Sequence, residues 1–390
     1  MYGPVFLRGF LLSVLLIATS AFGAEGPVLT PLKPGGVYAL GERAGWTVSV
    51  PAGAKLSGEY SYKLKKNNFD VIKSGRLKLS QRSTIEISLN EPAMLYLEVT
   101  GPEKGAKPVA YGAAIAPTQL RPVVPRPADF EQFWAEKIAQ LRKVPANPVL
   151  TQKDSGRPDV DYYILQMDHI DGRHIYGQVA KPKHAGKFPG LAIFQWASPP
   201  YPLQREWVTE RAAEGWLAVN IEPHDVLPDQ PKEYYDALPK ELKEYTTIGQ
   251  ENRDKNYFTY MYLADYRAIE YLASRPDWNG QTLIASGTSM GGQQSLCAAG
   301  LNPKVTGLIV HVASGADANG PLHGRASGYP FWPTDDHKVW PADNPKVMAT
   351  MPYVDTVNCA MNIKVPSLVS MGFIDVTSPP VGIFTAFNQI

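Results

Sequence analysis

The chain has almost no excess of charge of either sign. Its 390 residues include 38 Lys and Arg against 37 Asp and Glu, a formal net charge of +1. A protein that holds nucleic acid or an anionic membrane by electrostatics needs a strong positive field, so neither is an expected partner. A small neutral or weakly charged substrate fits this composition better.

Long apolar runs are also missing, except near the N-terminus. The run from Phe10 to Ala18 follows Arg8 and is too short to span a bilayer. Small residues at positions 21 and 23 then offer a cleavage site, so residues 1–23 are predicted to be a secretory signal peptide. The alternative is an uncleaved N-terminal anchor. Because no later segment is apolar enough to span, the mature protein is expected to be secreted or periplasmic.

Cysteine is scarce. Cys297 and Cys359 are the two in the chain, and in a secreted protein they could pair. We favour two buried thiols instead, one on a core helix and one before a core strand, because free cysteine is among the most buried residue types. No cluster of side chains has the spacing of a metal site. We therefore expect neither a metal nor an organic cofactor.

The N-terminal part alternates apolar and polar residues with a period of two. The alternating runs are Trp46–Val50, Tyr60–Leu64, Leu77–Leu79, Thr84–Leu89 and Leu95–Val99. Such runs, bounded by Gly, Pro and Asn, are typical of half-buried antiparallel strands. Several of them at short spacing predict a small all-β, immunoglobulin-like sandwich domain over residues 24–117.

After a stiff proline-rich linker at residues 118–127, the pattern changes. A helix opens at Asp129, and apolar strands then alternate with helices. The predicted strands are 190–194, 216–221, 282–286, 305–312 and 365–371, and the later helices are 207–214 and 257–274. This alternation predicts an α/β fold over residues 128–390, with a mostly parallel sheet covered on both faces. In such sheets the reactive groups gather at the carboxyl ends of strands.

The run Gly287-Thr288-Ser289-Met290-Gly291 lies at such a strand end. A predicted strand precedes it and a helix follows, which is the context of a nucleophile elbow. The glycines clear the space that so sharp a turn needs. We therefore predict Ser289 as the nucleophile, and the alternative is a tight turn with an idle serine.

An oxyanion hole needs two backbone N–H groups. Met290, the residue after the nucleophile, is predicted to supply one. The loop after the first α/β strand should supply the other, from Ala197, with Trp196 as the near alternative. Trp196 is also expected, without excluding that role, as an aromatic wall of the substrate pocket.

Asp375 follows the last predicted strand, where this fold carries the acid of its triad. Asp335 and Asp336 are weaker candidates because no strand delivers them. From about Arg121 to Ile390 the chain resembles the acetyl xylan esterase and cephalosporin C deacetylase family, carbohydrate esterase family seven. The resemblance is carried in chain order by PADFEQFW at 127–134, YLADYRAIE at 262–270, and GFID, PP and FTAFN between residues 372 and 388.

The resemblance implies an α/β-hydrolase fold, Ser289 as nucleophile and Asp375 as triad acid. The chain departs from the family at two motifs. Met290 replaces the glutamine that usually follows the serine, which makes the pocket more apolar but leaves a backbone N–H in place. The family's Arg-Gly-Gln-Gly stretch is replaced by Glu222-Pro223-His224-Asp225.

The third departure concerns the base. The family's catalytic histidine follows the acid, whereas every histidine here precedes Asp375: His169, His174, His184, His224, His311, His323 and His337. We interpret His311 as a strand-end residue and His224 as a structural or substrate-contact residue, because chain order places the base elsewhere. We therefore expect these 390 residues to be a fragment without its last strand, His loop and final helix, so that 365–371 is an open sheet edge.

The expected function is that of a serine carboxylic-ester hydrolase. It would remove acetyl groups from acetylated xylan, xylo-oligosaccharides or related small acetyl esters through a Ser-Asp-His triad and an acyl-enzyme. The alternatives are a peptidase or general carboxylesterase on the same scaffold, or a non-catalytic carbohydrate-binding protein of hydrolase shape. Without its histidine the fragment itself is expected to be inactive. Homo-oligomer formation stays open.

Overall fold

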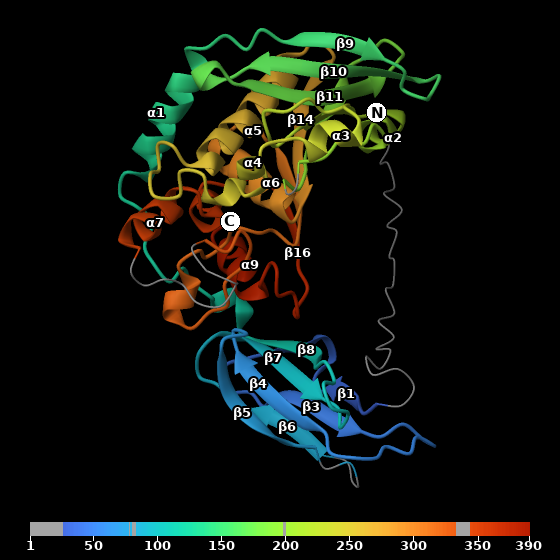
Figure 1. Ribbon diagram of the computed structural model, residues 1–390, viewed down its shortest axis with the longest axis vertical. Coiled ribbons are helices and arrows are strands. Elements are labelled where there is room, and N and C mark those ends of the chain that lie inside the picture. The colour runs from blue at the N-terminus through green and yellow to red at the C-terminus, as the bar shows by residue number, and fades with distance from the viewer. Residues whose placement is uncertain (1–25, 78, 80–82, 198–199, 333–343) are drawn as a thin grey trace, which may run out of the picture.

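The structure is a computed structural model that describes residues 26–77, 79, 83–197, 200–332 and 344–390. The predicted signal peptide and the two weaker acid candidates, Asp335 and Asp336, lie outside the described residues. Figure 1 shows β sheets built from the N-terminal third of the chain lying against a larger α/β body that contains the C-terminal residues.

The N-terminal part contains two sheets that share one core. A three-stranded sheet has the order β1-β3-β6 and a five-stranded sheet has the order β2-β8-β7-β4-β5. Their bounds are β1 (Val28–Pro31), β2 (Val37–Tyr38), β3 (Ala44–Ser49), β4 (Ser61–Lys66), β5 (Asp70–Arg76), β6 (Ser83–Ile87), β7 (Ala93–Thr100) and β8 (Val109–Ile115). Trp46 and Ile85 from one sheet and Leu64 and Leu97 from the other are fully buried together.

Most of the alternating runs predict these strands correctly, but one does not. The run at residues 77–79 lies after β5, which ends at Arg76. A tight turn in which Asn67 and Asn68 adopt positive φ precedes β5. Most residues of β5 are exposed, so no alternation marks this strand. Strands β1, β2 and β8 were also absent from the prediction.

The α/β body is built on a mixed eight-stranded sheet of order β16-β15-β14-β12-β13-β11-β10-β9. Strands β12 to β16 are parallel, while β9, β10 and β11 pair antiparallel at one side. The bounds are β9 (Val149–Lys153), β10 (Val160–Asp168), β11 (His174–Pro182), β12 (Phe188–Phe194), β13 (Leu217–Ile221), β14 (Trp278–Thr288), β15 (Gly307–His311) and β16 (Ser367–Ser370). The five predicted strands are confirmed, and the three antiparallel ones were missed.

Helices cover both faces of this sheet, as the alternation predicts. They are α1 (Phe130–Arg142), α2 (Glu206–Ala213), α3 (Lys232–Asp236), α4 (Lys240–Lys243), α5 (Tyr257–Ser274), α6 (Met290–Leu301), α7 (Pro345–Thr350), α8 (Thr356–Ala360) and α9 (Pro380–Phe387). The predicted helix at 257–274 has the bounds of α5. None of the helices in the described ranges combines the length and apolar character that a bilayer crossing needs.

One prediction about buried residues is confirmed. Cys297 on α6 and Cys359 on α8 are free, buried thiols, and burial raises the pKa of the Cys297 thiol well above its usual value. Strand β16 is the last strand at its side of the described sheet. Leu368 on this strand is 59% exposed.

Candidate active site

Ser289 occupies a strained turn between β14 and α6. Its backbone has φ 58° and ψ −119°, a conformation that non-glycine residues adopt rarely and at a cost of about 1–3 kcal/mol. Three backbone hydrogen bonds hold it: the Ser289 N–H donates to His311 O at 2.9 Å, and Ser289 O accepts from Gln293 N at 3.0 Å and Ser314 N at 3.2 Å. The predicted strand, turn and helix are therefore present, and the side chain of Ser289 is partly exposed.

The glycines around Ser289 are required by close backbone contacts. A Cβ on Gly287 would lie 2.2 Å from the carbonyl carbon of Gly291. A Cβ on Gly291 would lie 2.0 Å from the carbonyl oxygen of Phe194, at the end of β12. Real side chains do not approach this closely, so only glycine lets β12, β14 and α6 meet here.

The same contacts bring the predicted oxyanion residues to one end of the sheet. Met290 is the first residue of α6 and is buried. The loop that leaves β12 is tied to this helix, because Gln294 Nε2 donates to Gln195 O at 2.6 Å and to Met290 O at 3.3 Å. Ala197 follows two residues later and is buried as well.

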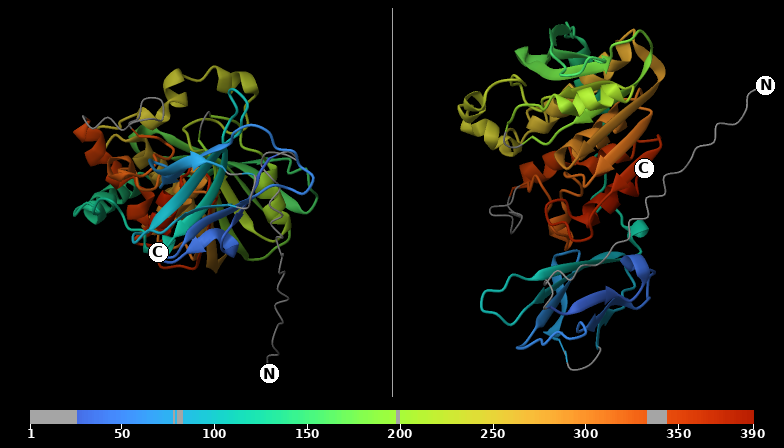
Figure 2. Two further views of the ribbon diagram at one scale, coloured as in Figure 1. Left: turned by 90° about the horizontal axis from the view of Figure 1, so that it is seen from below. Right: turned by 90° about the vertical axis from the view of Figure 1, so that its right-hand side faces the viewer.

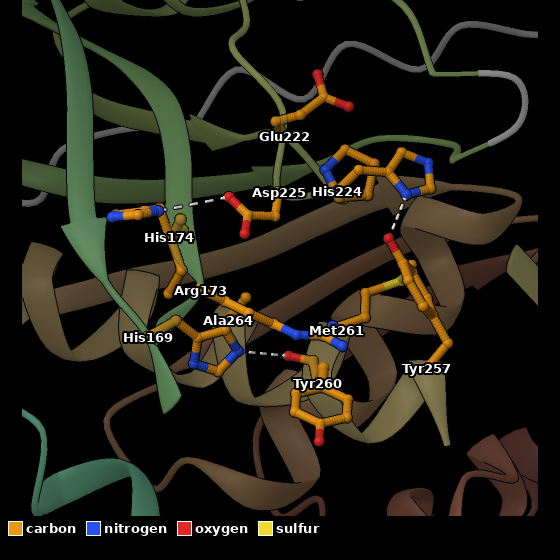
Figure 3. Close-up of a pocket in the computed structure, with 12 residues that line it drawn as sticks. His169, Arg173, His174, Glu222, His224, Asp225, Tyr257, Tyr260, Met261 and Ala264 are labelled. Atoms are coloured by element: carbon orange, nitrogen blue, oxygen red, sulfur yellow. Dashed lines mark hydrogen bonds and ion pairs between the residues drawn. The ribbon is translucent and has the colours of Figure 1, made fainter. Parts of the chain in front are cut away.

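His224 fixes the orientation of the Ala197 peptide. Its Nε2 makes a short hydrogen bond to Ala197 O, and its Nδ1 lies 2.6 Å from the Tyr257 hydroxyl. Because a carbonyl oxygen only accepts, Nε2 carries the proton and the Tyr257 hydroxyl donates to Nδ1. Burial lowers the pKa of His224 to about 4, so the ring is neutral at pH 7. Figure 3 shows His224 and Tyr257 joined in this way. No local signal in the sequence links position 224 to position 197.

Glu222 lies two residues before His224 and is fully buried. Neither of its carboxyl oxygens has a hydrogen-bond partner within the described part of the chain. Burial raises the pKa of Glu222 well above its usual value, so the group is neutral over a wide pH range. In Figure 3 its carboxyl points away from the ion pair of His174 and Asp225. Because the pKa of Glu222 differs between the folded and the unfolded protein, this residue makes the free energy of unfolding depend on pH.

We expect Glu222→Gln to become more stable than the parent protein as the pH rises. The folded-state pKa of Glu222 is raised above the unfolded value, so its contribution is present below pH about 4.3 and is lost as the pH climbs through the folded pKa. Thermal unfolding at pH 4.5 and 8.5 is the measurement. The Tm difference between the two proteins should widen by about 3 °C or more at pH 8.5. A difference independent of pH contradicts the raised pKa, and exposed Glu241→Gln serves as the control.

Asp375 lies in a tight turn after β16. Its Oδ1 accepts hydrogen bonds from the N–H groups of Thr377 and Ser378, each at 2.8 Å. The strand ends Thr288, His311 and Ser370 stand in register on β14, β15 and β16. Ser289 and the loop that carries Asp375 therefore leave the sheet at the same end, on either side of β15.

His311 occupies the strand end between them. Its ring is exposed, and its Nδ1 lies 2.6 Å from Ser370 Oγ on the neighbouring strand. This is the satisfied strand-end hydrogen bond that the sequence analysis expects.

Trp196 presents a half-exposed aromatic surface beside the oxyanion loop. Its ring is 43% exposed and stacks on Tyr201 with centroids 4.8 Å apart and an interplanar angle of 22°. Trp207 meets it edge-on at 5.5 Å. The sequence analysis singled out Trp196 but not the two aromatic residues that support it, which lie further along the same loop and on α2.

The profile of the acetyl xylan esterase (AXE1) family matches residues 118–317 and 331–390. The chain belongs to this family. Acetyl esterase Axe7A of Xylanibacter ruminicola is 31% identical over 362 residues, covering 91% of this chain and 81% of that protein. Residues 118–390 alone are too few to make up 91% of the chain. The similarity to this relative therefore continues into the N-terminal sheets, whereas the resemblance found in the sequence analysis began at about Arg121.

Solved structures of acetyl xylan esterases share the α/β-hydrolase fold with this chain. The enzyme from Paenibacillus sp. R4 superposes with a TM-score of 0.60 at 23% identity, covering 70% of this chain and 88% of that one. The enzyme from Thermoanaerobacterium sp. JW/SL YS485 gives a TM-score of 0.58 at 20% identity, with coverage of 70% and 87%. At these identities the likeness establishes the fold.

Proposed function

We propose that this acetyl xylan esterase family member is a serine esterase that removes acetyl groups from carbohydrate, with Ser289 as its nucleophile. The observation that carries the proposal is the left-handed backbone of Ser289 at the junction of β14 and α6. Strain at a residue that three backbone hydrogen bonds hold in place is typical of functional sites. Membership of the family supplies the acetyl ester as the substrate class.

The chemistry follows from the groups at this end of the sheet. Ser289 Oγ loses its proton to a general base and attacks the acetyl carbonyl carbon. The N–H groups of Met290 and Ala197 stabilise the negative charge on the carbonyl oxygen, and the neutral His224 holds the Ala197 peptide in position. The base returns its proton to the sugar oxygen, the C–O bond breaks, and water then hydrolyses the acetyl-enzyme. Asp375 orients the base and stabilises its charged form.

In the family that the chain resembles, the general base is a histidine that follows the acid in chain order. His311 is the alternative nearest in the sheet. Its Nδ1 is engaged by Ser370, which leaves Nε2, the nitrogen through which a triad histidine acts as base, so the His311→Asn variant tests it. All activity experiments use the full-length gene product.

A fluorophosphonate probe tests the proposal, because only an activated serine reacts with it. We expect labelling of a single peptide that contains Ser289, and none in Ser289→Ala. Absence of labelling in the active-site peptide would favour the non-catalytic carbohydrate-binding alternative. Hydrolysis of acetylated xylo-oligosaccharides in preference to peptide amides separates the esterase from a peptidase on the same fold.

Trp196 is proposed as the aromatic wall against which the sugar lies. We expect Trp196→Ala to raise KM for acetylated xylo-oligosaccharides about tenfold while changing kcat/KM for a small chromogenic acetate less than threefold, because only the larger substrate reaches the ring. Steady-state kinetics with both substrates is the measurement. An equal loss on both would assign Trp196 to the oxyanion loop instead. Trp278→Phe, at the far end of β14, is the control.

We further propose that residues 1–23 direct export and are removed, and that residues 118–127 join a sandwich domain at 24–117 to a hydrolase domain at 128–390. Support comes from the short apolar run near the N-terminus and from the separate core of the two N-terminal sheets. N-terminal sequencing of the exported protein should begin near residue 24.

A further inference from the structure

The N-terminal sheets meet the α/β body at the loop that carries Asp375. Apolar residues from both parts form one cluster there, with Met94 and Ala114 from β7 and β8, Leu120 from the linker and Val381 from α9. Phe373, two residues before Asp375, packs on this cluster. Figure 2 shows the N-terminal sheets directly beneath the C-terminal segments.

Gly112 on β8 makes the closest of these contacts. A Cβ added to Gly112 would lie 2.5 Å from Phe373 Cβ, 2.8 Å from Phe373 O and 2.9 Å from its carbonyl carbon. The strand thus rests on the main chain of the loop as well as on a side chain. Any substituent at Gly112 must move β8 or the Phe373 backbone, because backbone atoms cannot rotate away.

The turn at residues 372–378 connects the Phe373 backbone to the Asp375 carboxyl, so a shift of that backbone is passed on to the carboxyl. The Asp375 N–H points to Gly372 O at 3.4 Å, and Asp375 Oδ1 binds the next two N–H groups of the turn. The carboxyl is therefore locked to the backbone of its own loop, so that a displaced Phe373 displaces Asp375 with it.

A second connection supports the same loop from the N-terminal sheets. The turn between β4 and β5 is held by a hydrogen bond from Met94 N to Asn67 Oδ1 at 2.9 Å, and Asn67 O accepts from Ala326 N at 3.0 Å. Three residues on, Tyr329 N donates to Thr377 O at 2.7 Å. The N-terminal sheets therefore contact the loop directly at Phe373, before Asp375, and reach Thr377, after it, only through residues 326–329.

We propose that the N-terminal β sheets are a positioning scaffold for the acid loop, and that Gly112 is the positioning residue through which β8 sets the place of Asp375. The proposal rests on the function proposed above. Its physical basis is that β8 lies against the main chain of Phe373, two residues before Asp375, and that apolar residues of both parts pack around this loop. A triad acid must be held within about 0.5 Å of its productive position, and the N-terminal sheets cover the loop that carries it.

Gly112→Ala tests the proposal against a matched variant, Gly75→Ala. Both glycines lie in the same five-stranded sheet, but the three atoms nearest to a Cβ at Gly75 all belong to the Tyr62 side chain, the nearest at 3.0 Å. For the full-length protein and a chromogenic acetate, we expect Gly112→Ala to lower kcat about tenfold or more with KM within twofold, and Gly75→Ala to keep kcat within twofold. The acid limb of the kcat/KM profile should move to lower pH in Gly112→Ala, because the base loses the charge that raises its pKa.

Introducing Gly112→Ala into the Asp375→Asn variant distinguishes an effect on the position of Asp375 from an unspecific loss of structure. If Gly112 acts through the carboxylate, Gly112→Ala should lower kcat less than twofold further in Asp375→Asn. A loss that persists in that background, or an equal loss in Gly75→Ala, overturns the scaffold proposal. Met94→Ala, which removes volume from the same cluster, gives the same readout if Gly112→Ala does not fold. Full activity of Asp375→Asn alone would overturn the acid assignment instead.

Discussion

Ser289→Ala is expected to lower turnover of a chromogenic acetate by about 10³-fold or more. The residual rate is what binding and the oxyanion donors supply without a nucleophile. The fold should be unaffected, since alanine removes one partly exposed atom and leaves the backbone hydrogen bonds of residue 289 in place. Initial rates and thermal unfolding of the full-length protein are the measurements.

His311→Asn is the control for this experiment. Asparagine keeps a polar group near Ser370 but cannot act as a base at neutral pH. We expect turnover within about threefold of the parent protein. A loss as large as that of Ser289→Ala would place the general base at His311, and unchanged turnover in Ser289→Ala would remove the serine mechanism altogether.

Gly291→Ala has the second large expected effect. Its Cβ would lie 2.0 Å from Phe194 O and 2.7 Å from the carbonyl carbon of that residue, so α6 and the end of β12 must separate. Since the loop that carries Ala197 begins there, the oxyanion donors separate as well. We expect a loss of about 100-fold or more in turnover, and a loss of about 3 kcal/mol in the free energy of unfolding.

Gly292→Ala is the matched comparison in the next position of the same helix. Its Cβ would meet the Val310 side chain at 3.0 Å and Ala313 at 3.2 Å, contacts that small adjustments relieve. Urea unfolding should show a loss of about 1 kcal/mol, and turnover should fall less than tenfold. Equal behaviour of the two variants would mean that the contact with Phe194 does not position the site.

The position of β15 explains how the proposed acid and the proposed nucleophile come to the same end of the sheet. The strands β14, β15 and β16 are parallel neighbours, so their carboxyl ends coincide although the chain between Ser289 and Asp375 is long. This is the general reason that α/β sheets build sites at one end. The loop that carries Asp375 is covered by residues from the opposite end of the chain, which is the basis of the scaffold proposal.

Local patterns predicted the elements whose signal lies within a few residues. The turn at Ser289 is an example. An apolar strand before it and glycines two residues to either side of Ser289 together predict a tight turn from strand to helix. Helix α5 is another, with an apolar face that runs through all of its turns. The antiparallel strands β9 to β11 were missed, since β9 is exposed along its whole length and carries no pattern of burial.

The amino-acid sequence by itself determined the α/β class, the turn at Ser289 and the loop position of Asp375, because each depends on short-range sterics or on apolar periodicity. The narrower α/β-hydrolase class came from the resemblance of its motifs to a known family, and the expectation of two buried cysteines from the usual burial of free cysteine. The tertiary structure alone decided that His224 holds the Ala197 peptide, that Glu222 is buried without a partner, and that Gly112 lies on the backbone beside Asp375. Such contacts join residues far apart in the chain. They depend on how whole sheets pack, and no residue type or local pattern in the sequence predicts them.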